Sequence, residues 1–204
     1  MLTSQDDFDR SSPTQVIEHA QAGNCYAFNV LVRHFEPEIH GYIAGLVGSS
    51  EEAYDLTQET MLRVWQKLPT LQDVLRFKPW LYSIARNRAY DYLRRQQRHP
   101  TTSLQSLQEL QADKPGLIVS DFSGRVEEAE LLQQALKELP PKLRDCLLLQ
   151  SIGKFSQQEI ADLLNMSKGS VAVYVSKARK QLRETLQRLG AALGRQEEGG
   201  PSDE

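Results

Sequence analysis

Cations and aromatic residues alternate between residues 76 and 99, and this mixture is suited to holding nucleic acid. The segment contains seven lysines or arginines against the single acid Asp91. Arginines bind phosphates, an asparagine can read a base edge, and exposed aromatic rings stack on unpaired bases. The candidate DNA-binding residues here are Lys78, Arg86, Asn87, Tyr90, Arg94 and Arg95. Their combination favours single-stranded or opening DNA over an intact duplex.

Two other residues of this segment fit structural roles better. Trp80 is expected in the core, because a tryptophan at an apolar helix position is more often buried than used as a stacking platform. Asp91 is expected to pair within its helix with Arg88 or Arg95, which lie three and four residues away. A merely solvated basic helix face remains the alternative for the segment as a whole.

A second basic stretch, residues 168–188, belongs to a pattern typical of a helix-turn-helix. Ser156 and Glu159 have the spacing of a capping box, which predicts a helix start at Ser156. After a turn at residues 165–166, Ser167 can cap a second helix, whose inward stripe is Val171, Val175, Ala178 and Leu182.

The outward residues of this motif are the candidate contacts to duplex DNA. They are Ser156, Lys168, Ser170, Ala172, Val173, Ser176, Lys177, Arg179 and Lys180. Residues near the start of the second helix are placed to reach base edges, whereas Lys177, Arg179 and Lys180 suit phosphates better. A helical hairpin in a protein-interaction module is the alternative, and the basic face favours DNA binding over it.

A polar face on the predicted helix 49–68 offers a different chemistry. Asp55, Gln58 and Glu59 surround the outward-facing Leu62. Charge-assisted hydrogen bonds around an apolar centre would suit a partner helix that carries arginine. Spacing alone leaves the simpler alternative open, namely that this acidic face is only solvated.

The elements that position these residues are all predicted to be helices. We expect an all-α fold of two small helical domains joined by a flexible linker, with the helix-turn-helix in the C-terminal domain. The predicted parts are an N-terminal domain 12–97, a linker 98–124, a C-terminal domain 125–189 and a disordered acidic tail 190–204. Residues 101–138, around the linker, carry seven acids and three bases, so an acidic stretch separates the two basic ones.

Capping residues, glycines and prolines predict where these helices begin and end. The predicted helices run from Ser12-Pro13 to Gly23-Asn24, from about Tyr26 to Gly48, from Ser49-Ser50 to about Leu68, from Pro79 to about Arg95, and from Val126 to Leu139. Pro140-Pro141 then separates the last of these from three further helices in 141–189.

Several classes of function find no support in the sequence. It offers no nucleophile–base pair and no cluster of metal ligands, so we expect neither an enzyme nor a bound cofactor. Cys25 and Cys146 lie far apart and are expected to be two buried free thiols. No stretch is apolar enough to insert into a membrane, and the acidic N-terminus does not resemble a signal peptide, so a cytoplasmic protein is expected.

Three motifs resemble those of extracytoplasmic-function (ECF) sigma factors, the smallest architecture in the principal bacterial sigma family. Residues 55–65 (DLTQETMLRVW) resemble the family's D-x-x-Q-E-x-F-x-x-x-W run. Residues 80–87 (WLYSIARN), with Asp91 and Arg94-Arg95, match its W-L-x-x-I-A-R-N-x-x-x-D-x-x-R run. Residues 139–144 (LPPKLR) and 155–161 (FSQQEIA) match its L-P-x-x-x-R and S-x-x-E-I-A segments, and the resemblance covers about residues 24–187.

The resemblance implies a role for each surface. Asp55, Gln58 and Glu59, with Leu62 between them, would dock on the clamp-helix coiled coil of the largest subunit of core RNA polymerase. The segment 77–95 would recognise and help to open the minus-ten promoter element, and the helix-turn-helix would read the minus-thirty-five element as duplex. An anti-sigma factor that masks these surfaces is also expected as a partner.

One departure from the family bears on which promoters are read. Family members often have G-T-V-K-S-R at the start of the recognition helix, where this chain has residues 169–174, GSVAVY. Ala172 and Val173 can touch thymine methyl groups but cannot make bidentate contacts to guanine. The promoter sequence therefore does not follow from the resemblance. A stand-alone helix-turn-helix regulator is the rival hypothesis, but it gives no use to the polar face or to the segment 77–95.

Overall fold

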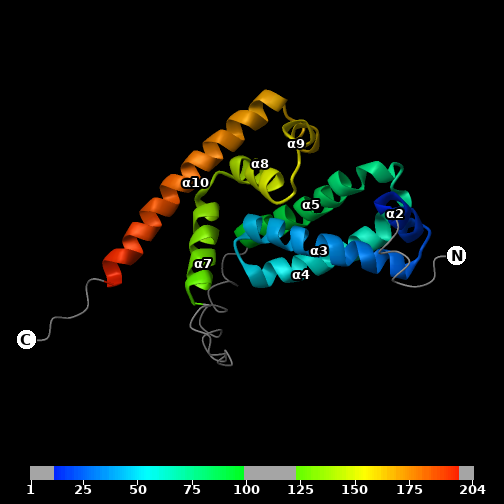
Figure 1. Cartoon of the computed structure of the whole chain (residues 1–204), viewed down its shortest axis with the longest axis horizontal. Coiled ribbons are helices and arrows are strands. Elements are labelled where there is room, and N and C mark those ends of the chain that lie inside the picture. The colour runs from blue at the N-terminus through cyan, green and yellow to red at the C-terminus, as the bar shows by residue number, and fades with distance from the viewer. Residues whose placement is uncertain (1–11, 99–122, 198–204) are drawn as a thin grey trace, which may run out of the picture.

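The computed structural model describes residues 12–98 and 123–197, and every regular element in these two ranges is helical (Figure 1). The N-terminal part contains α2 (Pro13–Gln21), α3 (Cys25–Val47), α4 (Ser50–Lys67), two 3₁₀ turns (Leu68–Thr70 and Val74–Arg76) and α5 (Phe77–Arg98). The C-terminal part contains α7 (Ser123–Glu138), α8 (Pro141–Ser151), α9 (Gln157–Leu164) and α10 (Lys168–Glu197). The expected all-α fold is confirmed. Most of the predicted linker lies outside the described residues.

Local capping chemistry sets most of the helix boundaries. The hydroxyls of Ser12, Ser49 and Ser156 accept hydrogen bonds from backbone N–H groups of the first turns of α2, α4 and α9. These bonds satisfy donors that have no partner inside a helix, and each such cap stabilises by about 1 kcal/mol. At the far end of α3, Gly48 adopts a φ of 76° and accepts the left-handed turn at little steric cost.

Two helices are longer than the sequence predicted. α5 begins at Phe77 rather than Pro79 and continues to Arg98, because a proline in the first turn of a helix interrupts no hydrogen bond within it. α10 continues through Gly190 to Glu197, so the prediction of a disordered tail from 190 is wrong for 190–197. Gly190 and Gly194 each cost the helix about 1 kcal/mol, and the two alanines and the leucine between them favour it.

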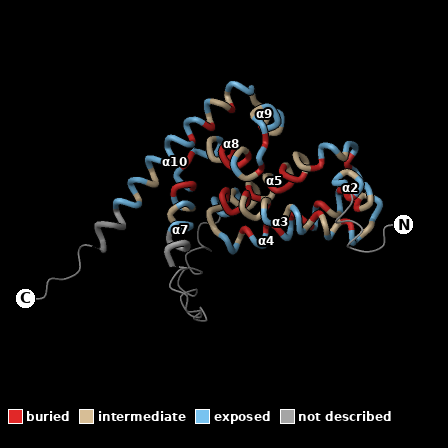
Figure 2. Tube along the Cα trace, in the orientation of Figure 1, coloured by how far each residue is buried: buried red, intermediate tan, exposed pale blue. Residues whose placement is uncertain are grey.

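One hydrophobic core runs through both parts of the chain (Figure 2). α3 packs on α4 and α5 within the N-terminal part, and its C-terminal half also packs on α7 and α8. The contact is close at Gly45, where a Cβ atom would lie 2.7 Å from a methyl carbon of Leu148. The two predicted domains therefore pack tightly against each other along α3.

The two cysteines differ in accessibility. Cys146 is buried in α8, as expected, but Cys25 is exposed at the start of α3, so the prediction of two buried thiols is wrong for Cys25. The reason is the position of Cys25 in the first turn, next to the exposed capping loop. Burial raises the pKa of the Cys146 thiol to about 11, with the nearby Asp145 carboxylate adding to the effect.

Candidate nucleic-acid interface

The polar face of α4 is open to solvent, as predicted. Asp55, Gln58, Glu59 and Leu62 are all exposed, and the Leu62 side chain is 63% exposed although it is apolar. Glu59 is not free, because it accepts a 2.5 Å hydrogen bond from Nη2 of Arg88 on α5. The open face therefore offers Asp55 and Gln58 around Leu62, while Glu59 joins α4 to α5.

A shallow apolar groove of about 450 Å³ lies beside Leu62, between α3 and α4. Phe28, Val32, Met61 and Trp65 contribute most of its apolar lining. The rings of Phe28 on α3 and Trp65 on α4 lie 4.8 Å apart within this lining. An exposed leucine beside such a groove is suited to receiving an apolar side chain from a partner.

Arg86 and Tyr90 of α5 point toward the C-terminal part of the chain and meet Asp145 of α8. Nε of Arg86 lies 2.6 Å from Oδ2 of Asp145, and the Tyr90 hydroxyl donates to the same oxygen at 3.2 Å. The hydroxyl of Tyr42, from α3, donates to Oδ1 at 2.7 Å. The Arg86 guanidinium also lies over the Tyr90 ring, 4.7 Å from its centroid. We call these four side chains the Asp145 cluster.

Burial makes the Asp145 cluster energetically important. Asp145 is only 1% exposed, whereas the Arg86 side chain keeps 33% exposure. Burial, and then the Asp145 charge, raise the pKa of Tyr42 well above its usual value. Although burial opposes it, the Asp145 carboxylate also raises the pKa of Arg86. A buried carboxylate with three donors is well satisfied, and one that lost them would be costly.

Further contacts along the same seam involve Lys78 and the loop before α9. Lys78 forms a 3.0 Å ion pair with Glu38 and lies over the Phe155 ring. Phe155 meets the ring of Tyr82 edge-on at 4.9 Å. Lys78, Arg86 and Tyr90, three of the residues predicted to bind DNA, therefore contact the C-terminal part of the chain in this arrangement.

The other predicted residues of α5 lie away from this seam. Asn87, Arg94 and Arg95 are exposed. Asp91 pairs with Arg94 rather than with Arg88 or Arg95, which corrects the sequence prediction. The Arg94 hydrogen bond holds the pKa of the Asp91 carboxyl below its usual value. All three arginines lie three or four residues from Asp91, and Arg88 is already held by Glu59, which leaves Arg94 for the pairing.

The helix-turn-helix has the predicted geometry. Ser156 and Glu159 form the capping box of α9, and Asn165 ends that helix with a φ of 53°. The Ser167 hydroxyl then accepts from the backbone N–H of Ser170 at 3.1 Å, at the start of α10. Val171, Val175 and Ala178 are buried as predicted, while Leu182 is half-buried.

On the outer surface of α10, some predicted DNA-binding residues are exposed without a partner in the described residues, and others already bind a neighbouring side chain. Lys168, Val173, Ser176 and Lys177 are exposed, and Ala172 and Ser170 are half-buried. Arg179 donates to Oε1 of Gln150 at 2.9 Å, and Lys180 lies 3.9 Å from Glu184. The Ser156 hydroxyl is engaged in its own cap. The open part of the predicted DNA-reading surface is therefore centred on Val173, Ser176 and Lys177.

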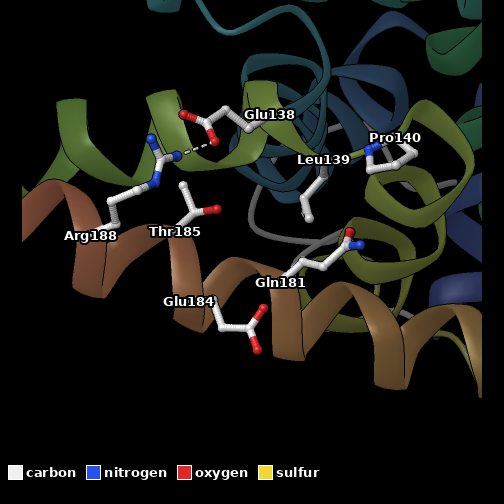
Figure 3. A pocket seen from close by; sticks show the side chains of 7 residues that line it. All are labelled: Glu138, Leu139, Pro140, Gln181, Glu184, Thr185 and Arg188. Carbon is white, nitrogen blue, oxygen red and sulfur yellow. Dashed lines mark hydrogen bonds and ion pairs between the residues drawn. The ribbon is translucent and has the colours of Figure 1, made fainter.

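Further along α10, a groove of about 450 Å³ separates this helix from α7 (Figure 3). Leu139 and Pro140 line one side, and Gln181 and Thr185 line the other. Arg188 bridges the groove to Glu138, and both side chains keep substantial exposure. This bridge and the packing of α7 and α8 on α10 hold the helix in place, and its first turns pack beside α9 (Figure 1).

Sequence reasoning missed Asp145 and placed its neighbour Arg144 only as the last residue of a family motif, without a contact. Nη1 of Arg144 donates to the Leu46 carbonyl of α3 at 2.7 Å, and Nη2 donates to the carbonyls of Lys137 and Leu139. These bonds tie the C-terminal ends of α3 and α7 together. The available signal was an arginine and an aspartate side by side at the start of an apolar run. This signal does not predict which residues they contact.

Two other features, a metal-binding cluster and a membrane span, are absent from the part of the chain that the structure describes. Within 12–98 and 123–197, no group of three or more His, Cys, Asp or Glu side chains could hold a metal ion. None of the helices in these ranges is long and apolar enough to cross a membrane. The open surfaces, together with the helix-turn-helix, define an all-helical protein built to bind DNA and a second macromolecule.

Comparison with known proteins identifies the class more closely. Residues 31–99 match the family model of sigma-70 region 2, and residues 129–182 match that of sigma-70 region 4. The RNA polymerase sigma-H factor of Pseudomonas aeruginosa is 28% identical over 195 residues, covering 93% of this chain and 98% of that protein. The ECF RNA polymerase sigma factor SigW of Bacillus subtilis is 27% identical over 181 residues, covering 85% of this chain and 96% of that protein.

A solved structure supports the same fold. The sigma factor RpoE from Bartonella quintana, crystallised with the anti-sigma factor NepR, has a TM-score of 0.61 and 22% identity, over 78% of this chain and 96% of that one. The chain belongs to the sigma-70 family and is an ECF sigma factor. Sigma factors are transcription initiation factors and are generally not enzymes.

Proposed function

We propose that this sigma factor binds core RNA polymerase through α4 and brings it to promoters that α5 and the helix-turn-helix recognise. The observation that carries the proposal is the presence, in one chain, of an exposed leucine in a polar helix face and a capped helix-turn-helix with an open basic surface. A DNA-binding regulator without polymerase has no use for the α4 face. Core polymerase and DNA acting together use both surfaces.

The polymerase contact is assigned to Asp55, Gln58 and Leu62, with Glu59 as a supporting residue. Asp55 and Gln58 are exposed and can accept hydrogen bonds from arginines of the clamp helices, while Leu62 supplies an apolar centre. Glu59 is tied to Arg88 and so fixes the position of α4 relative to α5. Its loss would disturb the DNA-binding helix as well as the polymerase face.

The minus-ten contact is assigned to α5 and the residues just before it. Asn87, Arg94 and Arg95 are open in the described arrangement. Lys78, Arg86 and Tyr90 become available only when the C-terminal part moves away from α5, because Asp145 and Phe155 now contact them. Binding of polymerase and promoter therefore requires the two parts of the chain to separate.

The minus-thirty-five contact is assigned to α10. Lys168, Ala172, Val173 and Ser176 are placed along the first turns of the helix and would meet base edges in the major groove. Ser170 is half-buried beside them, and Ser156 supports the site through its cap. Lys177, Arg179 and Lys180 would contact phosphates, once Arg179 and Lys180 exchange their present partners.

The proposed partners follow from these surfaces. Core polymerase and promoter DNA, both duplex and single-stranded, occupy α4, α5 and α10. An anti-sigma factor that masks them is a further proposed partner, supported by the solved relative bound to one. Because its partners in transcription work in the bacterial cytoplasm, we place the protein there.

In vitro transcription tests the proposal directly. Purified chain and core polymerase are mixed with a library of promoter-length random duplexes, and transcripts are sequenced. We expect transcription from a restricted set of sequences that depends on the added chain, and weak binding of the chain alone to the same duplexes. Tight specific binding without polymerase, together with no added transcription, would instead support a stand-alone regulator.

A further inference from the structure

The proposed function leaves two cations of α4, Arg63 and Lys67, without a role, and both line a basic groove between α4 and α5. It has a volume of about 280 Å³ and contains Arg63 and Lys67 of α4. α5 contributes Asn87, Arg88, Asp91 and Arg94, above the buried Ile84. Four cations therefore line the groove against one carboxylate, which is the opposite balance to the acidic outer face of α4.

The groove and the Asp145 cluster lie on different sides of α5. A helix turns about 100° per residue, so Arg86 and Tyr90 share one side of α5, while Asn87 and Asp91 each lie about 100° round from one of them. Asp145 thus covers one side of the helix and leaves the groove open. A ligand in the groove needs no movement of the C-terminal part.

Two of the four cations have no counter-charge of their own. Arg88 is held by Glu59, and Arg94 by Asp91. Within residues 12–98 and 128–191, no ion pair involves Arg63 or Lys67, and both are exposed. They stand one helical turn apart on α4, so both project into the same groove. Such a pair attracts an external anion.

The basic surface continues beyond the groove toward the end of α5. A second hollow, of about 360 Å³, is lined by Asp91, Arg94, Arg95 and Arg98, and it shares Asp91 and Arg94 with the first. The result is an elongated strip of positive charge rather than a compact anion pocket. A strip of this shape fits the phosphodiester backbone of an extended strand.

We propose that Arg63 and Lys67 hold phosphates of the non-template strand where the promoter opens. The proposal rests on the proposed function, since it presumes that α5 meets that strand. The groove supplies cations for the backbone and the Asn87 amide at its edge for a base. Because Arg63 lies one turn beyond Glu59 on α4, the strand would pass along the border of the polymerase-binding face.

Holoenzyme assembled from core polymerase and variant chain gives the test. The DNA is a promoter selected by the wild-type holoenzyme, prepared with its minus-ten region already unpaired. We compare Arg63→Ala, Lys67→Ala and the double variant with Lys142→Ala, an exposed cation of α8 outside the groove. Arg63→Lys and Lys67→Arg keep the charge.

Salt dependence is the first readout. Each lost phosphate contact on a single strand lowers the slope of log affinity against log salt by about 0.7, so the double variant should lose about 1.4 and bind roughly tenfold more weakly at low salt. The charge-keeping variants and Lys142→Ala should match the wild type. An unchanged slope in the double variant would overturn the proposal.

Neutral DNA backbones provide the second readout. Methylphosphonates replace phosphates one at a time along the non-template strand. At one or two positions the wild type should lose several-fold in affinity, whereas the double variant should lose nothing further, because its partner cations are absent. If every substitution weakens both proteins equally, Arg63 and Lys67 do not contact the strand.

Two controls separate this proposal from the function on which it rests. Core polymerase must bind the double variant as tightly as the wild type; a loss of core binding would make Arg63 and Lys67 polymerase contacts and overturn the proposal. A wild-type holoenzyme that starts no promoter-specific transcription would overturn the proposed function itself. Normal wild-type transcription with an unaltered double variant would overturn only the groove assignment.

Discussion

Replacing Asp145 by alanine should weaken the packing between the two parts of the chain. The substitution removes the acceptor of the Tyr42 hydroxyl, which is completely buried, and such an unsatisfied group costs about 1–3 kcal/mol. It also removes the ion-pair partner of Arg86. Breaking a fully buried ion pair costs about 3–5 kcal/mol, but Arg86 is a third exposed and can regain water. We therefore expect a total loss of about 2–3 kcal/mol.

Fluorescence energy transfer between the two parts measures this loss. Cys25 is exposed on α3 and Cys146 is buried, so a dye pair can be attached at Cys25 and at Lys177→Cys while Cys146 stays unlabelled in the folded protein. Denaturant is added, and loss of energy transfer is followed beside loss of helix by circular dichroism. For Asp145→Ala, energy transfer should fall at distinctly lower denaturant than in the wild type, with helix content falling later.

A matched control comes from an exposed ion pair that joins two helices within the C-terminal part. Glu138→Ala removes the partner of Arg188, but both side chains are exposed, so the change should stay below about 1 kcal/mol. Tyr42→Phe keeps the ring and removes only the hydroxyl, and its effect should lie between the two. If Asp145→Ala moves the energy-transfer midpoint no more than Glu138→Ala does, the cluster does not hold the two parts together.

Three further predictions concern the remaining surfaces. Asp55→Ala combined with Gln58→Ala should weaken association with core polymerase at least tenfold and leave the circular dichroism spectrum and thermal midpoint unchanged; equal association would refute the assignment of the α4 face. Lys177→Ala should lower promoter affinity and reduce the salt slope by about 1, as expected for one phosphate contact on duplex DNA, and an unchanged slope would contradict that role. The hydrogen bonds from Ser156 hold the pKa of Glu159 below its usual value, so its cap should stabilise α9 fully above roughly pH 4.3 and lose that effect as the pH falls further. The stability difference between the wild type and Glu159→Gln should accordingly shrink on acidification, and a difference that grows would reverse the sign of this reasoning.

The helices could be predicted from local sequence signals. The contacts between residues far apart in the sequence could not. The capping box at Ser156, the stripe of Val171 and Val175 and the exposed face around Leu62 follow from spacing within one or two helical turns. Asp145 and Tyr42 lie 103 residues apart, and the apolar run that contains Asp145 does not indicate which side chains would bind its carboxylate. Arg86, Tyr90 and Arg94 recur at steps of four residues, but such a step drifts around the helix, and only the first two meet Asp145.

The Asp145 cluster connects the packing of the two parts to the proposed function through simple competition. Arg86 and Tyr90 cannot bind Asp145 and promoter DNA at once, so the fraction of chains with separated parts sets their apparent affinity for DNA. If the packed form is favoured by about 2–3 kcal/mol through Asp145, that affinity is reduced by roughly 30- to 150-fold, at about 1.4 kcal/mol per factor of ten. Polymerase binding that separates the two parts would remove this reduction. The groove that contains Arg63 and Lys67 is outside the competition, because it is open in the packed form. The first contact with an opening strand is therefore best made there, and Arg86 and Tyr90 follow once the parts separate.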